Sequence, residues 1–357
     1  MVTRTMSGTA AWTAAAKGPA TRWSDHIARL TDDVVTVAHR PKFAISRDAR
    51  FFCIGSCFAR NIEEHLIYHD IAVLSRRIVS PHGEWPARAN GFVNKFTTHS
   101  IRNELDWALV PPPVDARAFQ QQQDGWLDLQ LSPRMPPVPL ERAIARRRYL
   151  NTDYFARVRT ADIVVLTLGL NEIWFDARAG RHLNAAPSFT ATRREPDRYA
   201  LHLTDVADNL AALEGARAAI LALNPAARIV VTVSPVPMSE TFSGADVLVA
   251  NMRSKSTLRA AAAEFADAHD DVDHFPSYDI VSMSPRAQAY EADCLHVADS
   301  VVGAVMRSFL RAYLGLDGAA PAFDERAYLA AHPDVDAAVR RGELASGFEH
   351  WRAMAAA

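Results

Sequence analysis

The sequence has few cysteines and no long apolar run. Only Cys53, Cys57 and Cys294 occur in 357 residues, so no disulfide framework is indicated and a reducing compartment is the simpler interpretation. No stretch approaches the roughly 18 consecutive apolar residues of a membrane-spanning helix. The apolar stretch at 10–16 is short, poor in leucine and followed by Lys17, which makes it a poor signal peptide. We therefore expect a cytoplasmic protein without a transmembrane segment.

Charge of one sign is also missing. The 39 basic and 41 acidic residues give a net charge of −2 and are mixed along the chain, which argues against nucleic acid or an anionic membrane as a partner. Neither a Gly-x-Gly-x-x-Gly pattern nor a P-loop occurs, and we predict no cofactor. Apolar residues make up 49% of the chain, enough for a sizeable core.

Short apolar runs alternate with helical patterns along the chain. The predicted strands cover 50–55, 71–74, 162–169, 227–233 and 272–275. The predicted helices follow Gly55 through 67, start from a cap at 97–100 and run to 109, and cover 203–223, 251–268 and 299–314. Such alternation implies parallel pairing through right-handed crossovers. The predicted fold class is α/β, a three-layer doubly wound parallel sheet.

The remaining segments suggest additions to one large domain. Residues 1–42 lack a clear period and are expected to form a partly ordered arm with a short helix around 23–30. The α/β domain is expected over 43–316, with a polar loop at 80–96 and a Pro- and Gln-rich insertion at 111–148. Residues 317–357 are expected to form a helical module of two small helices packed on that domain.

The stretch Gly55-Ser56-Cys57-Phe58-Ala59 joins the first apolar run to the first helix. In a parallel sheet, ligands bind where the carboxyl end of a strand leads into a helix. A thiol in the first helical turn is favoured in its reactive thiolate form, which makes Cys57 the predicted nucleophile. Ser56 is the alternative nucleophile, and a small buried residue without chemistry is the other interpretation of Cys57.

This stretch resembles the motif of the GSCFA family, which looks like a divergent branch of the SGNH (GDSL-type) hydrolases. The resemblance runs from about 43 to about 314 and implies a flavodoxin-like strand order. It sets Cys57 in the position of the nucleophilic serine. It also sets Asn171, in Gly169-Leu170-Asn171-Glu172, as an oxyanion donor beside the Cys57 backbone N–H. The third donor has no clear equivalent, and Gly91 or Asn94 are the guesses.

The predicted base is His296, which lies three residues after Asp293. A single turn can bring the carboxylate to Nδ1 and leave Nε2 for the nucleophile. Lys255 and Arg259 share one helical face and could contact an anionic or polyhydroxy substrate, or act as structural ion-pair partners. No metal site is predicted, because the spacing of the cysteines and His296 does not suit zinc.

These residues lead to three functional hypotheses. The first is an acyl-ester hydrolase or O-acyltransferase, which the resemblance associates with carbohydrate O-acyl groups and which would use Cys57, His296 and Asp293. The second is a non-catalytic glycan-binding or assembly protein that keeps the fold with a retired site. The third is a redox role for Cys57 and Cys294.

Overall fold

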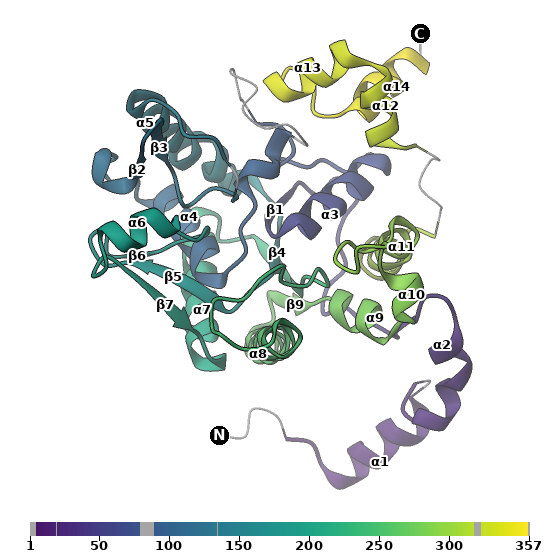
Figure 1. The fold of residues 1–357 in the computed structure, drawn as a ribbon. Coiled ribbons are helices and arrows are strands. Elements are labelled where there is room, and N and C mark those ends of the chain that lie inside the picture. The colour runs from purple at the N-terminus through teal and green to yellow at the C-terminus, as the bar shows by residue number, and fades with distance from the viewer. Residues whose placement is uncertain (1–4, 19, 79–88, 134, 318–322, 356–357) are drawn as a thin grey trace.

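The computed structural model describes most of the chain, and Figure 1 shows its arrangement. The described residues are 5–18, 20–78, 89–133, 135–317 and 323–355. A central parallel sheet runs through the molecule in the strand order β1-β4-β8-β9. These strands are β1 (Phe51–Gly55), β4 (Ile163–Leu168), β8 (Arg228–Val233) and β9 (Val272–His274). Four of the five predicted strands are therefore confirmed.

The fifth predicted strand, 71–74, is reduced to a single parallel bridge between Val73 and Phe51. The Phe51 N–H donates to Ala72 O at 2.8 Å, and the Leu74 N–H donates to Phe51 O at 2.8 Å. This segment lies on the outer side of β1. In chain order the sheet therefore reads 2-1-3-4-5, which is the flavodoxin-like order.

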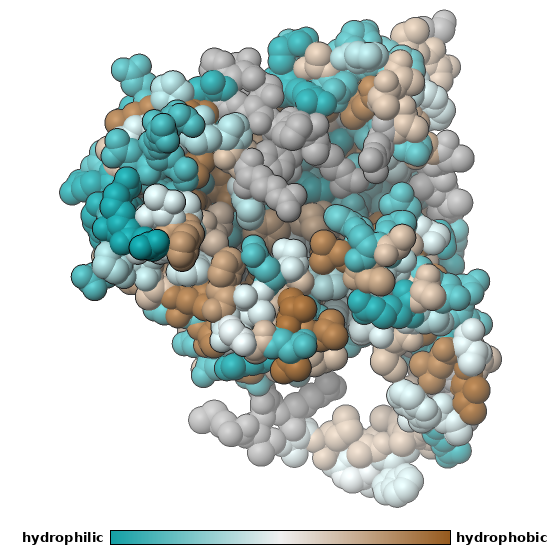
Figure 2. Space-filling model, in the orientation of Figure 1, coloured by the Kyte–Doolittle hydropathy of each residue, from teal (hydrophilic) through white to brown (hydrophobic). Residues whose placement is uncertain are grey.

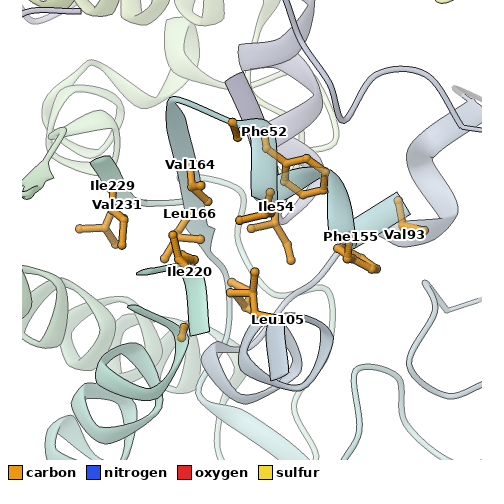
Figure 3. Close-up of a cluster of buried hydrophobic side chains, with 14 of the residues drawn as sticks. Phe52, Ile54, Val93, Leu105, Phe155, Val164, Leu166, Ile220, Ile229 and Val231 are labelled. Carbon is orange, nitrogen blue, oxygen red and sulfur yellow. The ribbon is translucent and has the colours of Figure 1, made fainter. Parts of the chain in front are cut away.

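Alternate side chains of the strands face two different layers of helices. Phe52, Ile54, Val164, Leu166 and Val231 enter one buried cluster, part of which Figure 3 shows. That cluster includes side chains from α4 (Thr98–Leu109), α7 (Val206–Leu223) and α8 (Val247–Ala268). The opposite cluster holds side chains from α3 (Cys57–Tyr68), α9 (Ser277–Met283) and α11 (Asp299–Leu314). Because both faces are covered by helices, the predicted three-layer α/β fold is confirmed.

A small antiparallel sheet was not predicted from the sequence. It has the order β6-β5-β7 and consists of β5 (Glu172–Asp176), β6 (Arg181–His182) and β7 (Tyr199–Leu203), with α6 (Phe189–Arg194) before β7. The prediction that a helix begins at Leu203 is wrong, because Leu203 ends β7. The helix starts only after Asp205, whose side chain accepts the Asp208 N–H in a capping box.

The insertion at 111–148 contains a hairpin and a helix with an apolar cluster of their own. The elements from here to β4 are η3 (Ala116–Ala118), β2 (Gln120–Gln122), β3 (Gly125–Leu127), α5 (Leu140–Tyr149), η4 (Leu150–Tyr154) and η5 (Phe155–Thr160). Residues 80–88 of the loop predicted at 80–96 lie outside the described residues, and the loop then contains η2 (Ala89–Val93).

Short helices precede and follow the α/β part. Those before it are α1 (Gly8–Lys17), η1 (Trp23–His26) and α2 (Ile27–Thr31), and α10 (Arg286–Ala289) lies before α11. Those after it are α12 (Glu325–Ala331), α13 (Pro333–Arg341) and α14 (Gly347–Ala355), three helices where two were expected. Among the helices described, none is long and apolar enough to cross a membrane.

The C-terminal helices are joined to the α/β part by a buried ion pair and apolar contacts. Arg76 Nη2 lies 3.1 Å from Glu325 Oε1, and both side chains are buried. Val335 and Val339 of α13 belong to the same apolar cluster as the strands, and α13 packs against η2. The module therefore supports the chain just before the segment that borders the candidate site.

Candidate functional site

The turn between β1 and α3 depends on Gly55. Its φ of 146° is a conformation that residues with a Cβ rarely adopt. A Cβ here would also lie 2.2 Å from Thr167 O, on the neighbouring strand β4. The Ser56 N–H donates to the same carbonyl at 3.1 Å. Glycine therefore lets β1 end close beside β4 and turn directly into the helix.

Ser56 and Cys57 occupy different positions at the start of α3. Ser56 is the N-cap: its Oγ accepts the Phe58 N–H at 3.3 Å and lies 3.4 Å from Thr167 Oγ1, and the residue is buried. Cys57 is the first helical residue and is partly exposed. Capping occupies the Ser56 hydroxyl, while the Cys57 thiol lies in the first turn, where the helix dipole favours an anion.

The segment after η2 forms a second side of the site. The Lys95 N–H donates to Gly55 O at 2.7 Å. Phe96 O accepts the N–H groups of Gly169 at 3.1 Å and Leu170 at 2.7 Å. A Cβ at Gly169 would lie 2.8 Å from Phe96 O, so glycine is needed for this close approach. The segment thus bridges the carboxyl ends of β1 and β4.

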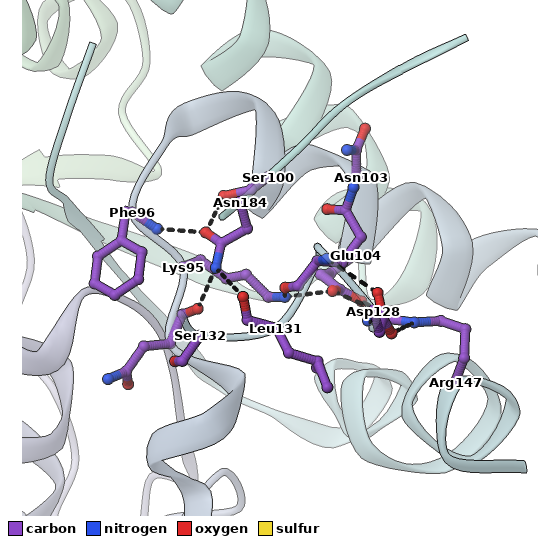
Figure 4. Close-up of polar contacts among 12 residues, drawn as sticks. Lys95, Phe96, Ser100, Asn103, Glu104, Asp128, Leu131, Ser132, Arg147 and Asn184 are labelled. Atoms are coloured by element: carbon purple, nitrogen blue, oxygen red, sulfur yellow. Dashed lines mark hydrogen bonds and ion pairs between the residues drawn. The ribbon is translucent and has the colours of Figure 1, made fainter. Parts of the chain in front are cut away.

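Buried charges hold this segment in place, as Figure 4 shows. Lys95 Nζ lies 2.5 Å from Glu104 Oε1, and Arg147 Nη1 lies 2.7 Å from Glu104 Oε2. Arg147 Nη2 lies 2.6 Å from Asp128 Oδ2. Two cations and two carboxylates are therefore buried as a balanced group. The Asn184 amide also accepts the Phe96 N–H at 2.8 Å and donates to Asn94 O at 2.9 Å.

Gly91 and Asn94, the guesses for the third oxyanion donor, both lie just before Lys95 in the chain. Gly91 is inside η2, where its carbonyl accepts the Ser132 hydroxyl at 2.7 Å and the Asn94 N–H at 3.3 Å. Asn94 is buried, and its Oδ1 has no hydrogen-bond partner among the described residues. The Asn94 backbone N–H is thus occupied by Gly91, which leaves the side-chain amide as the group to test.

Asn171, predicted as an oxyanion donor, follows β4 and is only 2% exposed. Its Nδ2 donates to Thr204 O at 3.0 Å, and its backbone N–H donates to Ser254 Oγ at 3.0 Å. One amide hydrogen is therefore used to join β5 to the start of α7. Glu172, the next residue, accepts the Phe242 N–H at 2.9 Å and anchors the loop before α8.

Lys255 and Arg259 both lie on α8, and they differ in exposure. Lys255 is fully buried, and its Nζ donates to Gly169 O at 2.8 Å. Burial lowers the pKa of Lys255 to about 7, and the nearby Cys57 opposes that change. Arg259 Nε lies 3.0 Å from Asp279 Oδ2, which is the structural ion pair that the sequence left open. Lys255 is therefore closed off from solvent, and contact of either side chain with a substrate stays a prediction.

Asp293 and His296 form a local pair in the loop before α11. Asp293 Oδ2 lies 2.5 Å from His296 Nδ1, and its Oδ1 accepts the Leu295 and His296 N–H groups at 2.9 and 3.0 Å. These hydrogen bonds, the His296 side chain first, lower the pKa of Asp293 to about 2. Cys294 has a φ of 54°, which the turn requires. The contact leaves His296 Nε2 for another partner.

This loop is tied to the same edge of the sheet as the β1–α3 turn. The Tyr290 hydroxyl donates to Pro235 O, just after β8, at 3.2 Å. Phe58 and Val297, the residues that follow Cys57 and His296, belong to one buried apolar cluster, and α3 packs against α11. Two segments about 240 positions apart are thereby packed together. The side chains of Asp293 and His296 stay 48% and 66% exposed.

In the described part of the chain, no side chains are arranged as a metal site or joined in a disulfide. All three cysteines are described, and none is in a disulfide. Cys53 is buried in β1, and burial raises the pKa of its thiol well above the usual range. Within the described ranges, no three His, Cys, Asp or Glu side chains are grouped so as to hold a metal ion.

Exposed apolar side chains gather at the start of α8, where Figure 2 shows hydrophobic atoms over this helix. Leu248, Val249 and Met252 are all exposed, and Phe242 precedes them in the loop. Since α8 follows β8, its first turns lie at the carboxyl edge of the sheet. Clustered apolar surface of this kind often marks a binding region.

The fold and these strand-end residues define an α/β protein with a candidate site at the carboxyl edge of a parallel sheet. The sequence pattern of the GSCFA family matches residues 50–309, which includes the β1–α3 turn and the Asp293–His296 loop. The chain belongs to the GSCFA family. No curated protein matches it.

Proposed function

We propose that the protein transfers acyl groups from esters through a thioester on Cys57. The observation that carries this proposal is the joint packing of the segment after Cys57 with the segment after His296, at an edge that also holds Asn171. The order of these residues along the chain is also that of the SGNH hydrolases, and we propose a distant relationship to them.

In the proposed reaction the Cys57 thiol gives its proton to His296 Nε2 and its sulfur attacks the ester carbonyl. The C–O bond of the ester breaks, and the departing alcohol takes the proton from His296. Asp293 holds the imidazole through Nδ1. Water then releases a carboxylic acid, or a sugar hydroxyl accepts the acyl group, and the thiol is restored. A thiol needs reducing surroundings, so we propose the cytoplasm as the compartment.

The substrate class that we propose is an O-acylated carbohydrate. The exposed apolar side chains at the start of α8 offer a surface for the acyl group. Hydrolysis and transfer differ only in which hydroxyl reaches the thioester. Comparing product formation with and without an added glycan acceptor distinguishes them.

Trapping the intermediate tests the proposal. The protein is incubated with p-nitrophenyl acetate, quenched in acid and mapped by mass spectrometry. An acetyl group on Cys57 that hydroxylamine removes, and that is lost in Cys57→Ala, is the expected result. Cys294→Ser serves as the control, because it removes an exposed thiol that the reaction does not use. An acetyl group on Ser56, or none on either residue, would overturn the proposed nucleophile.

A non-catalytic glycan-binding protein is the second candidate. The Asn171 amide favours it, since this group is buried and already donates to Thr204 O. Glycan binding that survives Cys57→Ala unchanged, together with no trapped acyl group, would support this candidate over the enzyme.

A further inference from the structure

A lysine is buried beneath the strand end next to the one from which Cys57 emerges. Lys255 lies on α8, is 0% exposed, and its Nζ donates to Gly169 O at 2.8 Å. Gly169 directly follows β4, and β4 pairs with β1 so that Thr167 is opposite Gly55. Burying an ammonium group is costly unless a negative charge or hydrogen bonds compensate it. A carbonyl oxygen alone is a weak compensation for a full charge.

The ionisable group that acts on Lys255 is Cys57. Burial lowers the pKa of Lys255 to about 7, and this value already includes the opposing effect of Cys57. Electrostatic interaction is mutual: a thiolate that favours the ammonium form is favoured by that ammonium to the same extent. The effect is strong in a buried setting because little water screens the two charges.

Several charged groups on α8 and on the elements packed against it pair with one another. The ion pairs are Glu214–His269, Arg217–Asp271, Arg259–Asp279 and His39–Asp273. His274 of β9 is buried, and burial lowers its pKa to about 4, so it is neutral near pH 7. Among the described groups, Cys57 is the one whose electrostatic effect on Lys255 is resolved.

We propose that Lys255 is a positioning residue for Cys57, in which the ammonium group anchored on Gly169 O holds the thiol in its thiolate form near neutral pH. The use of this thiolate in catalysis rests on the proposed function. The effect of Lys255 on the ionisation of the Cys57 thiol does not. The Lys255 side chain stays beneath the strand ends and supplies charge. With Cys57 already a thiolate, the proton transfer from the thiol to His296 precedes the attack, and His296 then gives this proton to the departing alcohol on the open side of the site.

The rate of alkylation by iodoacetamide as a function of pH tests this inference directly. The measurement is made on full-length Cys294→Ser protein, with modification of Cys57 followed by peptide mapping. Cys53 does not interfere, because it is buried and its pKa is raised. We expect the Cys57 rate to reach half its plateau at least one pH unit below the ordinary thiol value of about 8.5.

Replacement of Lys255 is expected to shift this profile. In Lys255→Met the midpoint rises by about one pH unit and the rate at pH 7 falls about tenfold. Lys255→Arg, which keeps the charge, restores part of the rate. Arg253→Met is the matched control: it removes an exposed cation two residues away on the same helix and leaves the midpoint unchanged.

The outcomes separate this inference from the proposed function. A wild-type midpoint at the ordinary thiol value would overturn the role of Lys255, even if every Lys255 variant failed to fold. An unchanged midpoint in a folded Lys255→Met protein would do the same while acyl transfer could persist. A lowered midpoint that depends on Lys255, without any trapped acyl group, would leave the inference standing and remove the enzyme proposal.

Discussion

Two parts of the candidate site are held in opposite ways. The segment at 94–98 is fixed by buried charges from α4, α5 and the insertion, whereas the loop at 290–297 carries its ionisable pair in solvent. The first can be changed only at a large cost in stability. The second can be changed with little cost in stability, so we expect its residues to serve something other than folding. Four experiments test this difference, from the largest expected effect to the smallest.

Lys95→Met should cause the largest loss. Without the Lys95 ammonium group, the carboxylates of Glu104 and Asp128 share a single cation, Arg147. One negative charge in the interior is then unbalanced. We expect the free energy of unfolding in urea to fall by about 3–5 kcal/mol. The double variant Lys95→Met/Glu104→Leu should recover part of this loss, because it restores charge balance. A loss of unfolding free energy below about 1 kcal/mol would mean that these buried charges do not hold the segment at 94–98 in place.

Arg76→Met should come next, with a loss of about 2–4 kcal/mol. It removes the buried partner of Glu325 and the donor to Ala345 O, and so loosens the C-terminal helices. Faster hydrogen exchange in α12–α14 and η2 is the expected signature. Arg77→Met is a matched control one residue away, because its pair with Glu349 is exposed and should contribute nothing resolvable. Equal effects of the two variants would contradict the buried docking.

His99 should make stability depend on pH. Burial first, and then His182, lower the pKa of His99 to about 4, below its value of about 6.5 in the unfolded chain. The contribution of neutral His99 to the free energy of unfolding is therefore complete above about pH 6.5 and is lost as pH falls toward 4. We expect wild type to lose about 1–2 kcal/mol more than His99→Gln over this window. Parallel curves, measured relative to pH 7.5, would exclude His99 as the source.

Asp293→Asn should have the smallest effect on stability. The side chain is 48% exposed, and the Asn oxygen can still accept the Leu295 and His296 N–H groups, so the urea midpoint should fall less than in Lys95→Met or Arg76→Met. Under the proposed function the rate of acyl transfer should nevertheless fall by a factor on the order of 10⁴, since His296 loses the group that orients it. Stability that falls as far as in Lys95→Met would show that the loop belongs to the structural frame.

Several parts of the fold could be predicted because they depend on near neighbours. The cap at Thr97 and the continuous apolar runs of β4 and β8 follow from residue type and short spacing. The 71–74 strand was overestimated, since its apolar run pairs with β1 at one residue only. The sheet β5–β6–β7 was missed because its strands are short and partly exposed, so their apolar pattern is weak.

The sequence by itself determined the order of the four strands of the central sheet, the Gly55 turn and the approach of Asp293 to His296. Each of these depends on side chains only a few positions apart, whose hydrogen bonds form within a single turn. Only the tertiary structure decided that Lys255 is buried beneath Gly169 near Cys57, and that Lys95 bridges Glu104 to the end of β1. Lysine is usually a surface residue, and its burial depends on packing among elements far apart in the chain.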